Sequence, residues 1–434
     1  MDSDFDDDRP QKVVELIDDL LGRIGFVIID RPVNGSTAGG IRYSSDVTED
    51  EVARLARVMT LKWAFLNLAM GGGKAGIQAD LEQLGCDRAS LMKAFGRSIA
   101  PLVKDHSFYP GVDLGTNMED LEIIMREAGS PLEGGQVDSS FCTALTVFEA
   151  IKQLSDFLNF KLNDLHFVLE GFGKVGSELA VLLCNQGARM VGVSTQFGAL
   201  YSESGLDISE LILLKKSYGD RLIEHYRHAD VIPLEALFEK PVDLIIPGAR
   251  PNAINENNVD QIKARMIVPI ANIPFAPQTE GRLADRGVLI VPDFVANCGG
   301  ILASGMYGQG FNLQDARFVI ENVYAQVIEE ILMSAKKQQR SIREIAESVA
   351  WRNYNSFHEV VLKPKGAPIR VIGLISTHGL TGLVRRIAWR IFQRYPSIQG
   401  ALRHAAIGRY AEMGLEVTRD RIAGMSLTGD NVST

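Results

Sequence analysis

Two lysines and one aspartate in the first third of the chain have side chains suited to proton transfer. Lys62 and Lys74 lie twelve residues apart, and Lys74 stands in the run GGGKAG, where the glycines contribute no side chains to surround its ammonium. Asp113 lies between glycines in YPGVDLGTN and could pair with Lys74. A lysine near other positive charge and away from water loses its proton readily and can act as a general base.

Each of these residues also has an ordinary structural interpretation. A helix lysine such as Lys62 commonly extends its ammonium into water, and an aspartate between glycines commonly forms a turn. GGGKAG is not a phosphate-binding P-loop, because it lacks the earlier glycine and the Ser or Thr that follows the lysine. Spacing alone therefore leaves both interpretations of Lys62 and Asp113 open.

A second motif, GFGKVG, follows the apolar run HFVLE (166–170) and precedes a helical pattern. Gly171 permits a tight turn, Gly173 lets the backbone approach a pyrophosphate, and Gly176 lets the helix pack against the strand. In this strand–turn–helix context the motif predicts a dinucleotide site for NAD or NADP. The other motif residues in this predicted site are Phe172, Lys174 and Val175.

The choice between NAD and NADP depends on the end of the next strand, where an acidic residue normally binds the adenosine ribose. Here the strand ends VGVSTQ, and Ser194 or Thr195 stands at the acidic position. The repulsion that disfavours a 2′-phosphate is then missing, which favours NADP or dual use. No arginine is adjacent to bind the phosphate, so the sequence leaves the cofactor open.

The elements that must position these residues follow from apolar periodicity. Apolar strands alternate with helices from residue 165 onward, which predicts a parallel, doubly wound sheet. The predicted strands are 26–30, 166–170, 190–193, 243–247, 266–270 and 288–292. The predicted helices are 11–24, 48–68 with a Thr48/Glu51 capping box, 91–103, 118–128 with Asn117 as its cap, and 313–358.

The length of 434 residues, with 46 % apolar and 23 % charged residues, is enough for two domains and an appendage. We predict an α/β protein with a cleft between its domains: residues 1–136, then a Rossmann-type domain of residues 137–312, with helices from 313–358 returning to the first. Residues 361–434 hold 11 Lys/Arg against 4 Asp/Glu and follow the helix-breaking LKPKGAP. We expect them to form a basic, mainly helical extension.

Charge and cysteine content exclude several classes of function. The net charge of −9 argues against general nucleic-acid binding, which requires a basic face. The four cysteines are far apart and predict neither a disulfide framework nor a metal site. The aspartate-rich start is unlike a signal peptide, and no apolar run is long enough to span a membrane. We expect a cytoplasmic protein without a membrane partner, although the basic helix pattern at 383–395 leaves surface binding open.

The ordered motifs resemble those of the amino-acid dehydrogenases that act on glutamate, leucine, phenylalanine and valine. The resemblance covers about residues 25–355. Its motifs are AGGIRY (38–43), MTLKWAFLNLAMGGGKAGI (59–77), YPGVDLGTNMEDLEII (109–124), GFGKVG (171–176) and RGVLIVPDFVANCGGILAS (286–304).

The resemblance implies oxidative deamination of an L-amino acid to a 2-oxo acid and ammonia with NAD or NADP, or the reverse reaction. Lys62 would bind the α-carboxylate, Lys74 would activate water, and Asp113 would move protons. The resemblance also implies that the chain forms a homo-oligomer through its N-terminal domain. The remaining positions implied are Gly39 and Gly40 at the substrate entrance, and Thr143, Asn272 and Asn297 near the nicotinamide and its ribose.

Two departures concern the substrate and the activity. Ala38 stands where glutamate-specific members have a lysine for the side-chain carboxylate, although Ser304 matches a serine that contacts the same group. One hydroxyl compensates poorly for a missing charge, which favours a neutral side chain over glutamate. The run PIANIP (269–274) lacks the family's acidic residue and glycine. A catalytically silent, ligand-sensing paralogue therefore remains an alternative.

Overall fold

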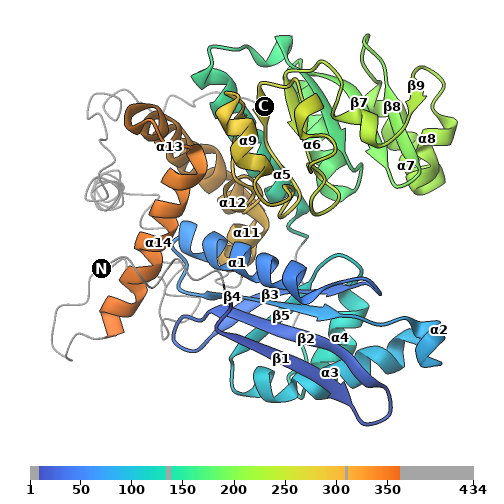
Figure 1. Cartoon of the computed structure of the whole chain (residues 1–434), viewed down its shortest axis with the longest axis vertical. Helices are drawn as coiled ribbons and strands as arrows, with labels where there is room; N and C mark the ends of the chain where they lie inside the picture. Colours follow the sequence, from blue (N-terminus) through green and yellow to red (C-terminus); the bar gives the residue numbers. More distant parts are fainter. Residues whose placement is uncertain (1–8, 133–137, 308–310, 362–434) are drawn as a thin grey trace, which may run out of the picture.

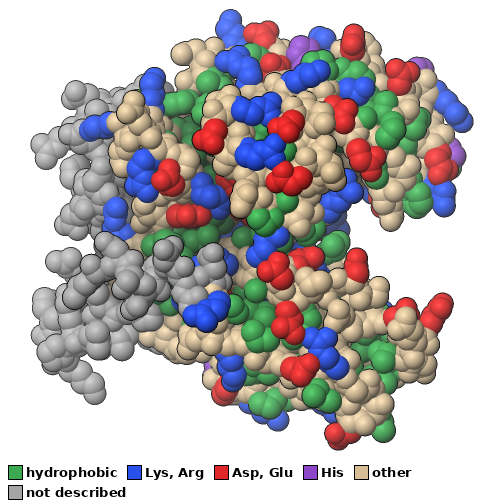
Figure 2. All heavy atoms as spheres, in the orientation of Figure 1, with side chains coloured by type: hydrophobic (Ala, Val, Ile, Leu, Met, Phe, Trp, Pro, Cys, Tyr) green, Lys and Arg blue, Asp and Glu red, His purple; other side chains and the backbone are tan. Residues whose placement is uncertain are grey.

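The computed structural model describes residues 9–132, 138–307 and 311–361, with side chains up to residue 357. Figure 1 shows two α/β bodies, a lower one from the first part of the chain and an upper one from its middle. Figure 2 shows a deep notch between them, on the side away from α14 (Ile342–Val361). The predicted α/β class is confirmed. The acidic start and the basic extension lie outside the described residues.

The lower body contains a five-stranded sheet in the order β1-β2-β4-β3-β5. Neighbours β4, β3 and β5 run parallel, and β2 pairs antiparallel with β1 and β4. A Cβ at Gly72 would lie 2.2 Å from the Ala56 carbonyl oxygen, so glycine lets a helix pack very close to β4. The strands are β1 (Lys12–Asp18), β2 (Gly22–Arg31), β3 (Thr37–Tyr43), β4 (Gly71–Ile77) and β5 (Phe108–Val112).

The helix predicted at 11–24 is wrong, because this segment forms the β1–β2 hairpin. The Asp18 carboxylate accepts hydrogen bonds from the backbone of Leu20 and Leu21, and Gly22 takes a φ of +73° that favours glycine. Leu20 is 90 % exposed at this turn. Its apolar side chain therefore imitates helical spacing without contributing to a core.

The lower body's helices are α1 (Glu49–Phe65), α2 (Leu81–Leu84), α3 (Arg88–Lys104) and α4 (Met118–Glu127). Asn117 caps α4 as predicted, in a capping box with Asp120. Only half of the box predicted for α1 forms. The Thr48 hydroxyl accepts from the Glu51 amide, but the Glu51 carboxylate binds Arg42 instead.

The upper body contains a seven-stranded sheet in the order β12-β11-β10-β6-β7-β8-β9. Its first five strands are parallel, as predicted, whereas β8 and β9 add an antiparallel edge that was not predicted. The strands are β6 (His166–Glu170), β7 (Arg189–Thr195), β8 (Gly198–Tyr201), β9 (Asp230–Ile232), β10 (Leu244–Ile246), β11 (Met266–Ile267) and β12 (Leu289–Ile290).

Helices cover this sheet and then return to the lower body. They are α5 (Ser140–Phe157), α6 (Lys174–Asn185), α7 (Ile208–Tyr218), α8 (Leu222–His225), α9 (Thr279–Asp285), α10 (Asp293–Ala296), α11 (Gly299–Tyr307), α12 (Leu313–Val319), a π-helical turn (Ile320–Tyr324) and α13 (Ala325–Gln338). From α14, Asn353 donates to the Ala64 carbonyl at 3.0 Å and Tyr354 to the Pro32 carbonyl at 3.2 Å. None of the described helices is long and apolar enough to cross a membrane.

Candidate active site between the two bodies

A buried cluster of three charged residues lies at one end of the lower sheet. Lys74, on β4, is 3 % exposed, and its Nζ lies 2.9 Å from Oδ2 of Asp113, which follows β5. Arg42, on β3, donates from Nε to the same oxygen at 3.0 Å and from Nη1 to Glu51 at 2.5 Å. The structure therefore brings together the lysine and the aspartate of the predicted pair and adds a guanidinium.

Glycines permit this close assembly of strands. A Cβ at Gly39 would lie 1.7 Å from the Gly73 carbonyl oxygen, and a Cβ at Gly40 would lie 2.7 Å from the Cβ of Asp113. Real Cβ atoms do not approach this closely, so both predicted positions require glycine for packing alone. The Asp113 side chain, which follows β5, is therefore held directly against the neighbouring strand β3.

Opposing effects set the charge of Asp113. Burial raises its pKa. The positive charges of Lys74 and Arg42 lower it by more than that, so the pKa is about 2. Burial also lowers the pKa of Arg42, yet Asp113 and Glu51 outweigh this and raise it. Asp113 is consequently an ionised counter-charge across the physiological pH range.

Lys62 lies inside the protein rather than in water. It is 5 % exposed on α1, and its Nζ donates to Oδ1 of Asn272 in the upper body at 2.7 Å. Burial lowers its pKa to about 8; Asp293 and Cys298 oppose this shift, and the nearby Lys74 adds to it. The solvated-lysine interpretation is therefore wrong for Lys62, which spans the junction of the two bodies.

The two predicted asparagines belong to the same junction. Oδ1 of Asn272 also accepts from Nδ2 of Asn297 at 3.0 Å, and that Nδ2 donates to the Ile270 carbonyl at 2.7 Å. Oδ1 of Asn297 is buried and has no hydrogen-bond partner among the described residues. A buried acceptor of this kind costs free energy unless a ligand donates to it.

The glycine motif has the geometry that its spacing predicts. Gly171 has a φ of +89°, and a Cβ at Gly176 would lie 2.3 Å from the Gly171 carbonyl oxygen. A Cβ at Gly173 meets nothing within 4 Å, and α6 begins at the next residue. There is thus open space beside the first residue of α6, where a phosphate can approach the helix N-terminus.

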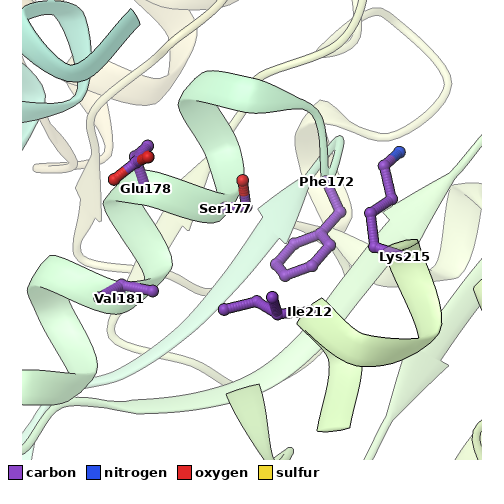
Figure 3. Close-up of a pocket in the computed structure, with 6 residues that line it drawn as sticks. All are labelled: Phe172, Ser177, Glu178, Val181, Ile212 and Lys215. Carbon is purple, nitrogen blue, oxygen red and sulfur yellow. The ribbon is translucent and has the colours of Figure 1, made fainter. Parts of the chain in front are cut away.

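Two other residues of the GFGKVG motif differ in their exposure to solvent. Lys174 is largely exposed and its ammonium lies 3.3 Å from Asp138, whereas Phe172 is buried. Figure 3 shows that Phe172 lines a small pocket between α6 and α7, together with Val181 and Ile212. Phe172 therefore anchors the motif to α7 through its side chain.

Known proteins with similar sequences identify the family of this chain. Residues 134–359 match the family model described as glutamate/leucine/phenylalanine/valine dehydrogenase, and residues 23–130 match the model of its dimerisation domain. The chain belongs to this dehydrogenase family. It is 36 % identical over 287 residues to the NAD-specific glutamate dehydrogenase of Staphylococcus aureus, covering 62 % of this chain and 68 % of the relative. It is 33 % identical over 296 residues to the glutamate dehydrogenase of Thermotoga maritima, covering 64 % and 71 %.

Solved structures share the family fold. The hetero-hexameric glutamate dehydrogenase of Thermus thermophilus, in its Leu-bound form, has a TM-score of 0.68 at 23 % identity and covers 82 % of this chain and 91 % of its own. The L-tryptophan dehydrogenase of Nostoc punctiforme has a TM-score of 0.58 at 23 % identity and covers 80 % and 96 %. At these identities the likeness establishes the fold of this dehydrogenase-family chain.

Several predicted positions make no hydrogen bond to Lys62, Lys74 or Asp113 among the described residues. Ala38 is half-buried on β3, and Ser304 is exposed on α11. Thr143 donates to the Ser139 carbonyl within its own helix, α5, at 3.3 Å. The Thr195 hydroxyl donates to the Asp220 carbonyl at 2.7 Å, so it is already engaged. Of the VGVSTQ pair, Ser194 is the one beside the glycine turn, since its carbonyl accepts from the Gly171 amide at 3.1 Å.

Sequence reasoning assigned no role to several residues of this dehydrogenase site. The sequence held one signal for Arg42, since it is the charged residue in an otherwise uncharged strand and shares a face with Gly40. Asp293 is buried and accepts from the Ile273 amide at 2.8 Å, and Ile273 has a φ of 44°, rare for a β-branched residue. This contact holds the unusual 269–274 segment next to Lys62, and nothing in the local sequence predicts it.

Proposed function

We propose that this protein is a NAD(P)-dependent amino-acid dehydrogenase that converts an L-amino acid to a 2-oxo acid and ammonia, or catalyses the reverse reaction. The observation that carries the proposal is the buried 2.9 Å contact between Lys74 and Asp113, at the junction that also buries Lys62. Family membership supports it, as do the names of the relatives from Staphylococcus and Thermotoga. We assign residues 1–136 to substrate binding and 137–312 to the dinucleotide.

Lys62 is suited to bind the substrate α-carboxylate. Its ammonium is desolvated, and its hydrogen-bond partner is the neutral Oδ1 of Asn272. A substrate carboxylate that binds there gives the Lys62 ammonium a charged partner in place of the neutral Asn272 amide. Its negative charge raises the pKa of Lys62, which burial lowers. Substrate binding and protonation of Lys62 therefore reinforce each other.

Lys74 is suited to activate the attacking water, with Asp113 as its charge partner. A lysine acts as a base only after it has lost a proton, and the ionised Asp113 carboxylate, 2.9 Å from Nζ, stabilises the ammonium that forms when Lys74 takes a proton from water. The ionised Asp113 also stabilises positive charge that develops on the substrate nitrogen. Arg42 keeps this carboxylate oriented and ionised.

The turn after β6 and the Asn297 side chain after α10 fit a nicotinamide dinucleotide. Gly173 leaves open space at the start of α6, and the buried Oδ1 of Asn297 has no hydrogen-bond donor among the described residues. We assign the pyrophosphate to Gly171–Gly176, and the nicotinamide and its ribose to Thr143, Asn272 and Asn297. When bound, the nicotinamide accepts a hydride from the substrate α-carbon.

A neutral substrate side chain is our preferred assignment, and glutamate is the second candidate. Ala38 contributes only a methyl group where a side-chain carboxylate would need a cation, and a lone hydroxyl at Ser304 compensates poorly. The glutamate alternative rests on the names of the relatives. We further propose that the chain assembles with copies of itself, since the matched N-terminal model is a dimerisation domain.

One plate assay tests the activity. The purified protein is mixed with NAD or NADP and each of the twenty L-amino acids, and the absorbance of the reduced nicotinamide is followed. We expect reduction with at least one pair, which Lys74→Ala abolishes while its circular dichroism stays that of the wild type. Absence of reduction with every pair, in folded protein, would refute the proposal and favour a ligand-sensing protein.

A further inference from the structure

The structure supplies an acidic group at the end of β7 that the strand itself lacks. Thr195 closes β7 and donates to the backbone carbonyl of Asp220 at 2.7 Å. Nε2 of the next residue, Gln196, donates to Oδ2 of Asp220 at 2.9 Å. Asp220 comes from the turn after α7, 25 residues along the chain, and its carboxylate is thereby fixed beside the strand end.

Lys215, on α7, holds the other carboxylate oxygen. Its ammonium contacts Oδ1 of Asp220, and its side chain borders the pocket around Phe172. Figure 3 shows the Lys215 ammonium directed away from the pocket, beside the turn that carries Phe172. Because Phe172 is the second residue of GFGKVG, the Lys215–Asp220 pair lies next to the dinucleotide motif.

The Asp220 carboxylate keeps capacity for a ligand. An ionised carboxylate has about four acceptor positions, and Lys215 and Gln196 occupy one on each oxygen. The side chain is 38 % exposed, so solvent, and with it a ligand, has access to this residue. In Rossmann folds the ribose of the adenosine lies at the end of the second strand, where a carboxylate accepts from its hydroxyls.

We propose that Asp220 binds the 2′-hydroxyl of the adenosine ribose and makes the protein prefer NAD to NADP, with Lys215 and Gln196 as the positioning residues. This inference rests on the proposed dinucleotide site. A 2′-phosphate at the same point would meet a carboxylate whose nearest cation is already paired, and like-charge repulsion would weaken NADP. The acidic residue missing from the sequence of β7 is thus provided by a different segment.

Titration calorimetry with the full chain tests this without any turnover. We expect the wild type to bind NAD at least about tenfold more tightly than NADP, and Asp220→Asn to reduce that ratio by about tenfold. The matched control Asp230→Asn, an exposed acidic residue on β9, should leave the ratio unchanged. An Asp220→Asn protein that binds dinucleotide with the wild-type ratio would overturn the inference.

A change in the ligand keeps the test independent of folding defects. Loss of the ribose hydroxyl in 2′-deoxy-NAD should weaken binding to the wild type by about tenfold, but to Asp220→Asn by less than about twofold. Equal losses in both proteins would overturn the role of Asp220. Failure of the wild type to bind either dinucleotide would instead refute the proposed dinucleotide site.

Discussion

At the scale of single residues, the site buries three cations, and only some of them contact an anion. Lys62, Lys74 and Arg42 are each less than 7 % exposed. Asp113 contacts two of them, while Lys62 has a neutral amide as its hydrogen-bond partner. Buried cations are costly unless a negative group compensates them; Asp293 acts on Lys62 from a distance, and no anion forms a hydrogen bond with its ammonium in the described part of the free protein. We propose that the α-carboxylate of a substrate supplies that anion.

The pH dependence of substrate binding follows from Lys62. Its pKa is lowered to about 8 in the free protein, so the ammonium is present below pH 8 and is lost as the pH rises. We expect the affinity for a 2-oxo acid, measured by fluorescence titration with the reduced cofactor present, to be constant near pH 7. Above pH 8 it should fall by about tenfold for each pH unit.

A variant separates this effect from other titrations. Lys62→Arg keeps its charge at all these pH values, so its affinity, even if weaker, should not fall between pH 8 and 9.5. A wild-type affinity that is flat over the same range would contradict the assignment of the carboxylate to Lys62.

The second residue-scale prediction concerns Arg42. Arg42→Met removes the cation that pairs with Glu51 and one of the two cations that contact the partly buried Asp113, and we expect the free energy of unfolding in urea to fall by about 3 kcal/mol. The matched control is Arg317→Met, which removes a largely exposed pair with Glu321 and should cost less than about 1 kcal/mol. Equal costs would mean that the Arg42 cluster contributes no more than a surface ion pair.

At the scale of elements, the turn from β6 to α6 contains a glycine that leaves room for a ligand and a glycine that is needed for packing. Gly173 has open space around its missing Cβ, whereas a Cβ at Gly176 would clash with the Gly171 carbonyl. We expect Gly173→Ala to keep the wild-type melting temperature and to weaken dinucleotide binding by tenfold or more, because the methyl group occupies the approach to the phosphates. We expect Gly176→Ala to lower both the melting temperature and the affinity.

Calorimetry and thermal melts on the two variants provide the check. Gly281→Ala is the control, since its added Cβ also meets nothing within 4 Å and it lies on α9. A Gly173→Ala protein with wild-type affinity would show that phosphates do not approach this turn.

The sequence predicts elements well where one periodicity dominates. The five parallel strands of the upper sheet and the helices α1, α3 and α4 lie where apolar spacing puts them. The β1–β2 hairpin is mispredicted because Leu20, in its turn, completes a helix-like pattern while packing against nothing. Periodicity records apolar spacing and cannot tell a turn residue from a core residue.

In the candidate site, too, residues in local motifs could be predicted, whereas contacts between distant segments could not. Lys74, Asp113 and the glycines stand in motifs, so the sequence offers their partnership as one of two interpretations, and the structure decides between them. Asp220 reaches β7 from 25 residues away, and the Lys62–Asn272 contact joins residues 210 positions apart. Such contacts depend on the path of the backbone between elements, which local spacing does not determine.

At the scale of the whole molecule, α1 connects the two bodies. Its apolar side chains Leu55, Val58 and Leu61 join the core that also holds α5 and Phe294. From the same helix, Arg54 donates to Asn252 at 3.0 Å and to the Phe275 carbonyl at 2.9 Å. The site therefore lies where one helix belongs to both bodies, and any change in their relative position moves Lys62 against Asn272.

The lower body also carries the surface that we expect to join copies of the chain. β1 is an edge strand of its sheet, and its Val13 and Ile17 are 46 % and 63 % exposed. An edge strand with outward apolar side chains is a template for pairing with another chain, and charged side chains there prevent it. The dimerisation-domain model matches this body from residue 23 onward. We therefore expect a particle whose mass is a multiple of 47.6 kDa by light scattering.

Lysines on β1 test where the copies meet. The double change Val13→Lys and Ile17→Lys should give a particle of lower mass with unchanged circular dichroism, because both side chains point away from the core. Leu213→Lys on α7, at a residue that is 66 % exposed in the upper body, is the control and should keep the wild-type mass. If the β1 variant also keeps that mass, the copies meet elsewhere; a wild type of 47.6 kDa would refute assembly altogether.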